Sequence, residues 1–422
     1  MNKQCTGLVA AIVFTALAAP SARAIDVTSG KWTLSFDGNV NAHYIYSNCE
    51  SNPVEVDGGL ACVATDSSSS VSNGLLPAAL TISGATTQDG YDIGFTFGLY
   101  PGISTNDGGS PNLGAGDAAG FGHTALGTAG LDIRQVFLTV GSKSMGTIMA
   151  GRNIGLFAAD AILNDMTLLG VGAGNGNYAA PGNTSLGSIG LGYIYTDWLS
   201  QINYTTPDMG GAKVTFGIFD PLNTLGQTPV NHSTPGFQGK IAYTIGSLYL
   251  SASGLYQKQR LDCADAPLAA CTDHVEYGSN AFDFGGKYDV AGLEVMGWYY
   301  IGHGVGTTGL FVDSNDAAAN PRHSDGFLAQ VTYKMGPTKV GLNYGQSNLD
   351  TASADAVTGI TGSPLLLSQG LVHKNDKWTA GVYHDLTDNL MLVGEYSRLE
   401  SENQIGQKNT SWNLNLGLFL KF

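Results

Sequence analysis

The chain has 422 residues, of which 59 are glycine, about twice the ordinary share, and only 13% are Asp, Glu, Lys or Arg. A hydrophobic content of 43% argues against disorder, and no stretch after residue 24 runs about 18 residues without polar interruption, which excludes a helical membrane protein. The 34 acidic residues outnumber the 19 basic ones and no Lys/Arg cluster occurs, so neither a nucleic-acid binder nor a polybasic lipid patch is indicated.

Residues 1–24 have the features of a secretory signal peptide. Lys3 gives a charged start, residues 8–19 are apolar, and Ala-Arg-Ala at 22–24 is a cleavage site. An uncleaved membrane anchor is the alternative, but about a dozen apolar residues are too few to span a bilayer. We therefore expect one exported domain of residues 25–422.

Strict alternation marks both ends of this domain as β-strands. Between residues 31 and 46 the even positions, from Trp32 to Tyr46, are mostly apolar or aromatic, and most odd positions are polar. The alternation returns from Trp412 to Phe422. A period of two over such lengths indicates a strand with one apolar and one polar face, and a closed sheet would pair the first strand with the last.

Between these strands the sequence predicts seven hairpins, each with a short turn rich in Gly, Pro, Asn or Asp. They are 78–87/91–100, 131–141/147–154, 189–206/212–220, 237–245/247–259, 280–290/293–302, 325–335/338–348 and 376–386/390–400. Eight longer connectors separate the strands: 47–77, 101–130, 155–188, 221–236, 260–279, 303–324, 349–375 and 401–408.

Sixteen strands with alternating short and long connections are typical of an all-β, antiparallel transmembrane barrel, with short periplasmic turns and long extracellular loops. Closure gives every backbone polar group in the hydrocarbon region a partner. A soluble sandwich or propeller is the alternative, but it gives no reason for the alternation of short and long connections.

The alternation also predicts which side chains face lipid. Aromatic residues such as Phe282, Phe284 and Tyr288 should point outward, and a charge among them would cost about 2–4 kcal/mol, so the strand charges should face a polar, wet lumen. Trp32, Tyr46, Trp378 and Trp412 suit aromatic girdles. The charges expected in the lumen are Asp37, Lys240, Asp283, Lys287, Glu294, Lys334, Lys339 and Glu395.

Four cysteines remain after removal of the signal peptide, and they form two close pairs. Cys49 lies near Cys62, and Cys263 lies near Cys271. Disulfides within each pair are the simplest interpretation for an exported protein. Metal binding is the poorer alternative, because no C-x-x-C spacing occurs. Sequence alone does not fix the pairing.

Two segments resemble Gram-negative trimeric general porins. Residues 134–138 (RQVFL), followed by GT at 146–147 and GR at 151–152, are similar to the segment that precedes the porin constriction loop. Residues 202–211 (INYTTPDMGG) are similar to the stretch that follows it, and the terminal Phe422 resembles the C-terminal aromatic of porins. The cysteine pairs and the long first and second loops depart from the family.

The resemblance implies a homotrimer of water-filled barrels, each narrowed by a third loop that folds inside. By position this loop is 155–188. In the family, acids on this loop face basic residues on the wall, so the resemblance makes Asp160 and Asp165 the loop acids, Arg152 a wall cation and Arg134 a weaker candidate. Arg152 shares the alternation of Ile148, so it faces the lumen only beyond a strand end or a bulge.

The family also implies contacts with outer-membrane lipid and lipopolysaccharide, and recognition of Phe422 by the barrel assembly machinery. The solutes would be small and hydrophilic, and nucleic acid is not expected as a partner. No catalytic or phosphate-binding motif appears, so we expect neither an enzyme nor a cofactor or metal.

Two functions remain open at this point. The first is passive diffusion through the outer membrane with a mild cation preference, because the long loops are acidic. The second is a plugged or narrow barrel that serves as an adhesin or receptor, or in substrate-specific uptake.

Overall fold

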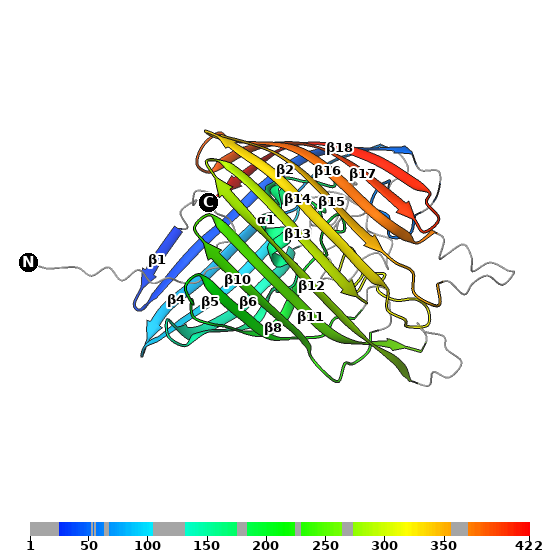
Figure 1. Cartoon of the computed structure of the whole chain (residues 1–422). Helices are drawn as coiled ribbons and strands as arrows, with labels where there is room; N and C mark the ends of the chain where they lie inside the picture. Colours follow the sequence, from blue (N-terminus) through cyan, green and yellow to red (C-terminus); the bar gives the residue numbers. More distant parts are fainter. Residues whose placement is uncertain are drawn as a thin grey trace, which may run out of the picture.

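The structure, a computed structural model, describes residues 25–51, 54, 56–62, 67–103, 131–174, 184–223, 229–263, 273–355 and 370–422. Within these ranges sixteen long strands, each antiparallel to its neighbours, close into a barrel (Figure 1). The barrel strands are β2 (Trp32–Ser51), β4 (Ala79–Gln88), β5 (Tyr91–Pro101), β6 (Leu131–Ser142), β7 (Gly146–Ile154), β8 (Trp198–Thr205), β9 (Ala212–Phe219), β10 (Gly236–Ile245), β11 (Leu248–Asp262), β12 (His274–Val290), β13 (Leu293–His303), β14 (His323–Met335), β15 (Thr338–Leu349), β16 (Val372–Asp385), β17 (Leu390–Asn403) and β18 (Lys408–Lys421).

The predicted sixteen-stranded barrel is confirmed, including the pairing of the first strand with the last. β18 pairs with β2, with Leu416 opposite Tyr44. At the end of this seam Phe422 and Gly38 exchange backbone hydrogen bonds of 3.0 and 3.1 Å. A side chain at Gly38 would collide with the carbonyl of Ala79, so the close approach of three chain segments requires glycine there.

Two short strands supplement the barrel. β1 (Ile25–Ser29) pairs with the first residues of β2, beyond the end of β18, and β3 (Ser68–Ser72) pairs with the later half of β2, beyond β4. The connector predicted at 47–77 therefore contains strand residues at its start and near its end. Both additions cover parts of β2 that would otherwise expose unpaired backbone groups.

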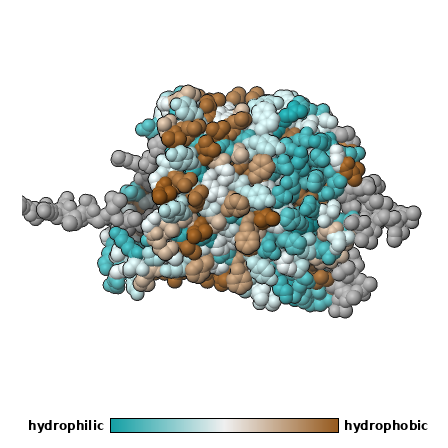
Figure 2. Space-filling model, in the orientation of Figure 1, coloured by the Kyte–Doolittle hydropathy of each residue, from teal (hydrophilic) through white to brown (hydrophobic). Residues whose placement is uncertain are grey.

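All the short turns lie at one end of the barrel, which we call the turn end, and the long loops lie at the other, the loop end (Figure 1). Hydrophobic side chains gather on the wall toward the turn end, and hydrophilic ones toward the loop end (Figure 2). The expected outward residues are exposed, with Phe282 at 61%, Phe284 at 56% and Tyr288 at 48%. None of the described helices has the length and apolar character to cross a membrane.

An aromatic row crosses four neighbouring strands on the outer wall. The ring of Trp412 lies 5.5 Å from that of Tyr46 and 5.9 Å from that of Tyr396, which in turn lies 5.4 Å from Trp378. Such a row matches the predicted girdle at a membrane interface.

One strand boundary was predicted wrongly. The sequence predicts a strand over 189–206, but β8 starts only at Trp198, and residues 189–197 belong to the third connection, which we call L3 (residues 155–197). Gly190 (φ 71°) and Gly192 (φ 142°) adopt backbone conformations that side chains rarely tolerate in a strand, and Tyr193 and Ile194 are fully buried. Packing inside the barrel overrides the local strand pattern here.

Candidate functional site: the loop inside the barrel

L3 enters the lumen and contacts the wall on several sides. It carries a short helix, α1 (Ala159–Asn164), and a 3-10 turn, η2 (Met166–Leu169). Along the loop, backbone N–H groups donate to the side chains of Gln238 on β10, Gln330 on β14 and Ser347 on β15. These hydrogen bonds satisfy buried loop amides and fix the loop across the barrel.

Asp160 lies on α1 and faces the wall at β10 and β11. Its carboxylate forms an ion pair with Lys240, with Oδ1 3.0 Å from Nζ, and accepts a hydrogen bond of 2.9 Å from the hydroxyl of Tyr249. The structure thus brings together a predicted loop acid and a predicted lumen cation. Both side chains are about nine-tenths buried, so the pair is held in a poorly solvated position.

Asp165 has a different role. It accepts hydrogen bonds from the backbone N–H of Thr167, as the N-cap of η2, from the hydroxyl of Tyr193 and from the amide of Asn343. Burial and the charge of Asp165 raise the pKa of Tyr193 well above its ordinary value, so the hydroxyl remains a donor. Asp165 therefore stabilises the loop through these hydrogen bonds.

Arg134 lies on the lumen side of β6, close to the loop end. Its Nε is 2.8 Å from Oδ2 of Asp132, and its guanidinium lies 5.3 Å from the ring centre of Tyr100 and 5.8 Å from that of Trp198. The β5–β6 register shifts between Gly98 and Leu99, which allows Arg134 to point inward. Arg134 is thus a paired, stacked cation beside the root of L3.

Arg152 does not lie on the lumen register. It pairs with Val136 and with Ser200, and Val136 is exposed on the outer wall. No bulge interrupts the β6–β7 or β7–β8 register at this position. Arg152 therefore lies on the outward face, contrary to its expected position, because the alternation of β7 continues through it.

The other predicted lumen charges occupy inward positions. Asp283 is 3% exposed and accepts a hydrogen bond from Ser253, Lys287 lies 3.5 Å from Glu294, and Asp37 faces inward on β2 opposite Thr81. Lys334, Lys339 and Glu395 also face inward, on β14, β15 and β17. Two of these groups bind L3: Asp283 accepts a hydrogen bond from the backbone of Ala158, and Glu395 holds the middle of the loop.

Glu395 joins β17 to the middle of L3. Its Oε2 accepts hydrogen bonds of 2.8 Å from the backbone N–H groups of both Val171 and Gly172, and its Oε1 accepts one of 2.6 Å from the hydroxyl of Tyr383. No space remains for a side chain at Gly170, whose Cβ would lie 2.0 Å from Oε1. Glu395 and Lys240 thus hold L3 from different parts of the wall.

Sequence reasoning missed Lys377 on β16. Its side chain is fully buried, its Nζ has no hydrogen-bond partner among the described residues, and its charge interacts with those of Asp165 and Glu395. Its neighbour Trp378 faces outward, and because side chains alternate along a strand, this could have placed Lys377 in the lumen. Lys377 supplies a positive charge behind L3, where two carboxylates are buried.

The lumen is less polar than expected. Met296, Trp298 and Leu328 point inward and pack against L3 residues such as Leu191 and Tyr193. A second apolar cluster joins Phe157 of L3 to Phe311 of the sixth connection, L6 (residues 304–322). The lumen predicted to be polar and wet thus also contains apolar side chains, because inward positions that contact L3 become a packed interior.

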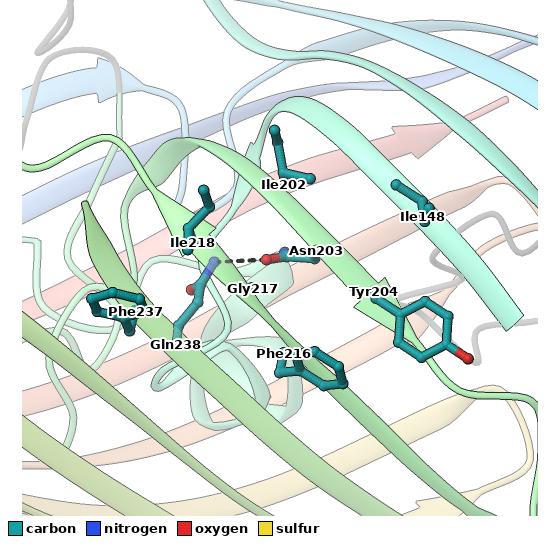
Figure 3. A pocket seen from close by; sticks show the side chains of 9 residues that line it. All are labelled: Ile148, Ile202, Asn203, Tyr204, Phe216, Gly217, Ile218, Phe237 and Gln238. Atoms are coloured by element: carbon teal, nitrogen blue, oxygen red, sulfur yellow. Dashed lines mark hydrogen bonds between the residues drawn. The ribbon is translucent and has the colours of Figure 1, made fainter. Parts of the chain in front are cut away.

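The outer wall carries a hollow between β7 and β10 whose lining is apolar (Figure 3). Ile148, Ile202, Phe216 and Phe237 line it, while Asn203 and Gln238 bond to each other at 3.3 Å. With its polar groups paired, the hollow is part of the apolar wall and not a site for a hydrophilic solute.

One of the two predicted disulfides is present. Cys49 and Cys62 are bonded and close the base of the first loop. Cys271 lies outside the described residues, so the second pair remains a prediction. No group of three or more potential metal ligands occurs in the described part of the chain.

Comparison with known proteins gives a family match over most of the chain. Residues 8–404 match the model of the Gram-negative porin family. A comparison with curated protein sequences finds no match.

Solved structures share the fold at low sequence identity. The outer membrane channel DcaP of Acinetobacter baumannii is 15% identical, with a TM-score of 0.66 over 95% of this chain and 100% of that one. OmpF of Salmonella typhi is 14% identical, with a TM-score of 0.56 over 94% and 100%. OmpT of Vibrio cholerae is 14% identical, with a TM-score of 0.55 over 94% and 100%.

Proposed function

Since this chain belongs to the Gram-negative porin family, and is thus a diffusion porin of the outer membrane, we propose that solutes cross it at a constriction set by L3, with Asp160 and Lys240 at its edge. The observation that carries the proposal is the path of L3 through the lumen, held by Lys240 on one part of the wall and Glu395 on another. A loop held at both places narrows the channel but does not fill its whole cross-section.

The constriction acids of this proposal differ from those expected from the family resemblance. Asp160 lies next to a wall cation and an inward tyrosine, so it is the acid that solutes would meet. Asp165 supports the loop from within, and Arg134 contributes positive charge nearer the loop end. Arg152 is not included.

We further propose a mild preference for cations at low salt. Acidic side chains gather at the loop end: burial and the charge of Asp57 raise the pKa of Asp313 on L6, so two acids from different loops lie near each other at the entrance. Such an entrance raises the local cation concentration, and salt screens the effect within about 10 Å at 0.1 M.

We propose that the mature chain begins at Ile25 and that three copies of it assemble into a homotrimer. A solved structure of Vibrio cholerae OmpT is described as a trimer form, which supports this proposal by analogy of fold. Lipopolysaccharide and outer-membrane lipid would contact the apolar wall, and the barrel assembly machinery would recognise Phe422. Small hydrophilic solutes remain the proposed cargo.

A narrower, substrate-specific barrel is the second candidate. The apolar clusters that join L3 to the wall and to L6 favour it, because they fill lumen space that a wide channel would leave to water. The two candidates share the fold and differ in conductance.

Planar bilayer recordings of the full mature protein separate the two candidates. Stepwise openings in KCl, arriving in groups of three, support the diffusion channel and the trimer. A salt gradient then gives the ion preference, and a reversal potential with the sign of anion selectivity would contradict the cation proposal. A folded protein that stays silent in KCl would favour the narrow barrel.

A further inference from the structure

Two lysines face each other directly on the lumen side of the wall, between L3 and the turn end. Lys334, next to the last residue of β14, pairs in register with Lys339, the second residue of β15. Residues in register on neighbouring strands point to the same face with Cβ atoms about 5 Å apart, and like charges in that position repel. Lys334 and Lys339 therefore form an unfavourable pair unless something of opposite charge lies nearby.

The carboxylates of this region compensate the pair incompletely. Glu294 lies 3.5 Å from Lys287 and accepts a hydrogen bond from Gln330, so it already has partners. The Nζ of Lys334 is 3.9 Å from Asp385, at the limit of an ion pair. The charge of Glu395 also reaches Lys339, but this carboxylate accepts hydrogen bonds from Val171, Gly172 and Tyr383. The three carboxylates near the two lysines are thus either bonded to other groups or at the limit of an ion pair.

Lys339 has no carboxylate in contact among the described residues. Its Nζ lies 4.8 Å from the ring centre of Tyr383, which stands opposite it on β16. A tyrosine face holds an ammonium group in place without neutralising its charge. The donor hydrogens of Lys339 that do not face the ring remain available to a ligand.

The pair also lies directly beneath the loop. Gln330 and Gly341 share the lumen face with the lysines, and both touch Met166 of η2: Gln330 accepts its backbone hydrogen bond, and a Cβ on Gly341 would lie 2.8 Å from its sulfur. Two residues along a strand is about 7 Å, so a solute that passes L3 next meets the two lysines.

We propose that Lys334 and Lys339 form a binding site for a small oxyanion, a phosphate or carboxylate group, on the turn side of L3. This inference deepens the proposed function and rests on it, because the ligand reaches the site as a solute of the channel. An oxyanion between two ammonium groups accepts charge-assisted hydrogen bonds from both and removes their repulsion. Such a site would retain anionic solutes after the constriction, in a channel whose entrance is acidic.

The test is phosphate binding to the full mature protein in detergent, measured by isothermal titration calorimetry at pH 7. Wild type should bind inorganic phosphate, and K334Q and K339Q should each weaken that binding about tenfold, because each removes one charged donor. K213Q is the matched control: Lys213 lies on the inward register of β9, near the same end of the barrel, and its neighbour across the sheet is Ala242. Binding by K213Q should stay within about twofold of wild type.

Acetate in a parallel titration separates the two sources of oxyanion. If acetate also binds to wild type and K339Q abolishes that binding, the site accepts carboxylates as well as phosphates. If only phosphate binds, the site is a phosphate site. Equal phosphate binding by wild type and the K334Q/K339Q double variant, or none by either, overturns the inference. Because calorimetry needs no ion current, a silent channel in bilayers would count against the proposed function and not against this site.

Discussion

The carboxylate of Glu395 lies 2.8 Å from the backbone nitrogen of Val171, a residue 224 positions earlier in the chain. This hydrogen bond and its companion at Gly172 join β17 to the middle of L3. A wall carboxylate that binds loop backbone holds this part of the loop whatever side chains it carries. Glu395 is therefore one of the wall residues that fix the position of L3 in the lumen, together with Lys240, Gln330 and Ser347.

We expect E395Q to loosen L3. Glutamine is uncharged: its oxygen can accept from the loop amides while its NH2 group donates to the Tyr383 hydroxyl. The charge-assisted hydrogen bonds that hold the loop, each worth about 1.5–3 kcal/mol, thus become weaker neutral ones. Open-channel current noise in planar bilayers should rise. E402Q is the control, since Glu402 lies on the outer face of the same strand, beside Lys374 and Lys408. Equal noise in E395Q and wild type would show that Glu395 does not hold the loop.

The ion pair between Asp160 and Lys240 predicts opposite effects of two single substitutions. D160N removes the negative charge bonded to Lys240 and should shift the permeability ratio toward anions, while K240Q removes the positive charge bonded to Asp160 and should shift it toward cations. A change of about 0.4 kcal/mol in the barrier gives about a twofold shift in each direction. Reversal potentials in a KCl gradient measure both. Shifts of the same sign would place the pair outside the conducting path.

Strand positions could be predicted from the sequence because alternation is a local property. A lipid-facing position near the middle of the bilayer strongly favours apolar side chains, so Phe282 and Tyr288 identify their strand face without knowledge of the rest of the chain. The same rule correctly warned that Arg152 shares the parity of Ile148. The family resemblance, which made Arg152 a wall cation, was the weaker guide.

The interior of the barrel could not be predicted in the same way. Gln330, Ser347 and Glu395 hold L3 from three strands, and nothing in their local sequence identifies a loop as their partner. Trp298 and Leu328 follow the inward alternation yet are apolar, because L3 covers them. Such contacts depend on where the loop lies, which is a long-range property.

Gly345, on β15, provides a steric test of this loop contact. A Cβ at Gly345 would lie 2.0 Å from the carbonyl oxygen of Leu191, which is backbone and cannot rotate away. We expect G345A to push L3 from the wall, at a cost of about 1–3 kcal/mol, and to change the single-channel conductance. G297A is the matched control, because a Cβ there meets nothing within 4 Å. If both variants conduct as wild type does, L3 does not press on β15.

An arginine joins L6 to the connection between β15 and β16, which we call L7. The Nε and Nη2 atoms of Arg322 lie 2.7 and 2.8 Å from the two carboxylate oxygens of Asp355. Burial alone would raise the pKa of Asp355, but the hydrogen bonds from Arg322 and from the backbone of Ala352, with the Arg322 charge, hold it below its ordinary value.

This lowered pKa predicts how the L6–L7 contact depends on pH. A carboxylate with a lower pKa in the folded state contributes stability that is fully present above its unfolded pKa of about 3.9 and is lost as the pH falls through the folded pKa. Hydrogen exchange of residues 304–322, corrected for its intrinsic rate, should therefore be constant from pH 7 to about pH 5 and increase below about pH 4. R322Q should exchange faster across the whole range, since it removes the bidentate pair, and it should lose the acid-dependent increase. An equal acid response in R322Q and wild type would assign the effect to other carboxylates, because only the wild-type loop contains the Arg322–Asp355 pair.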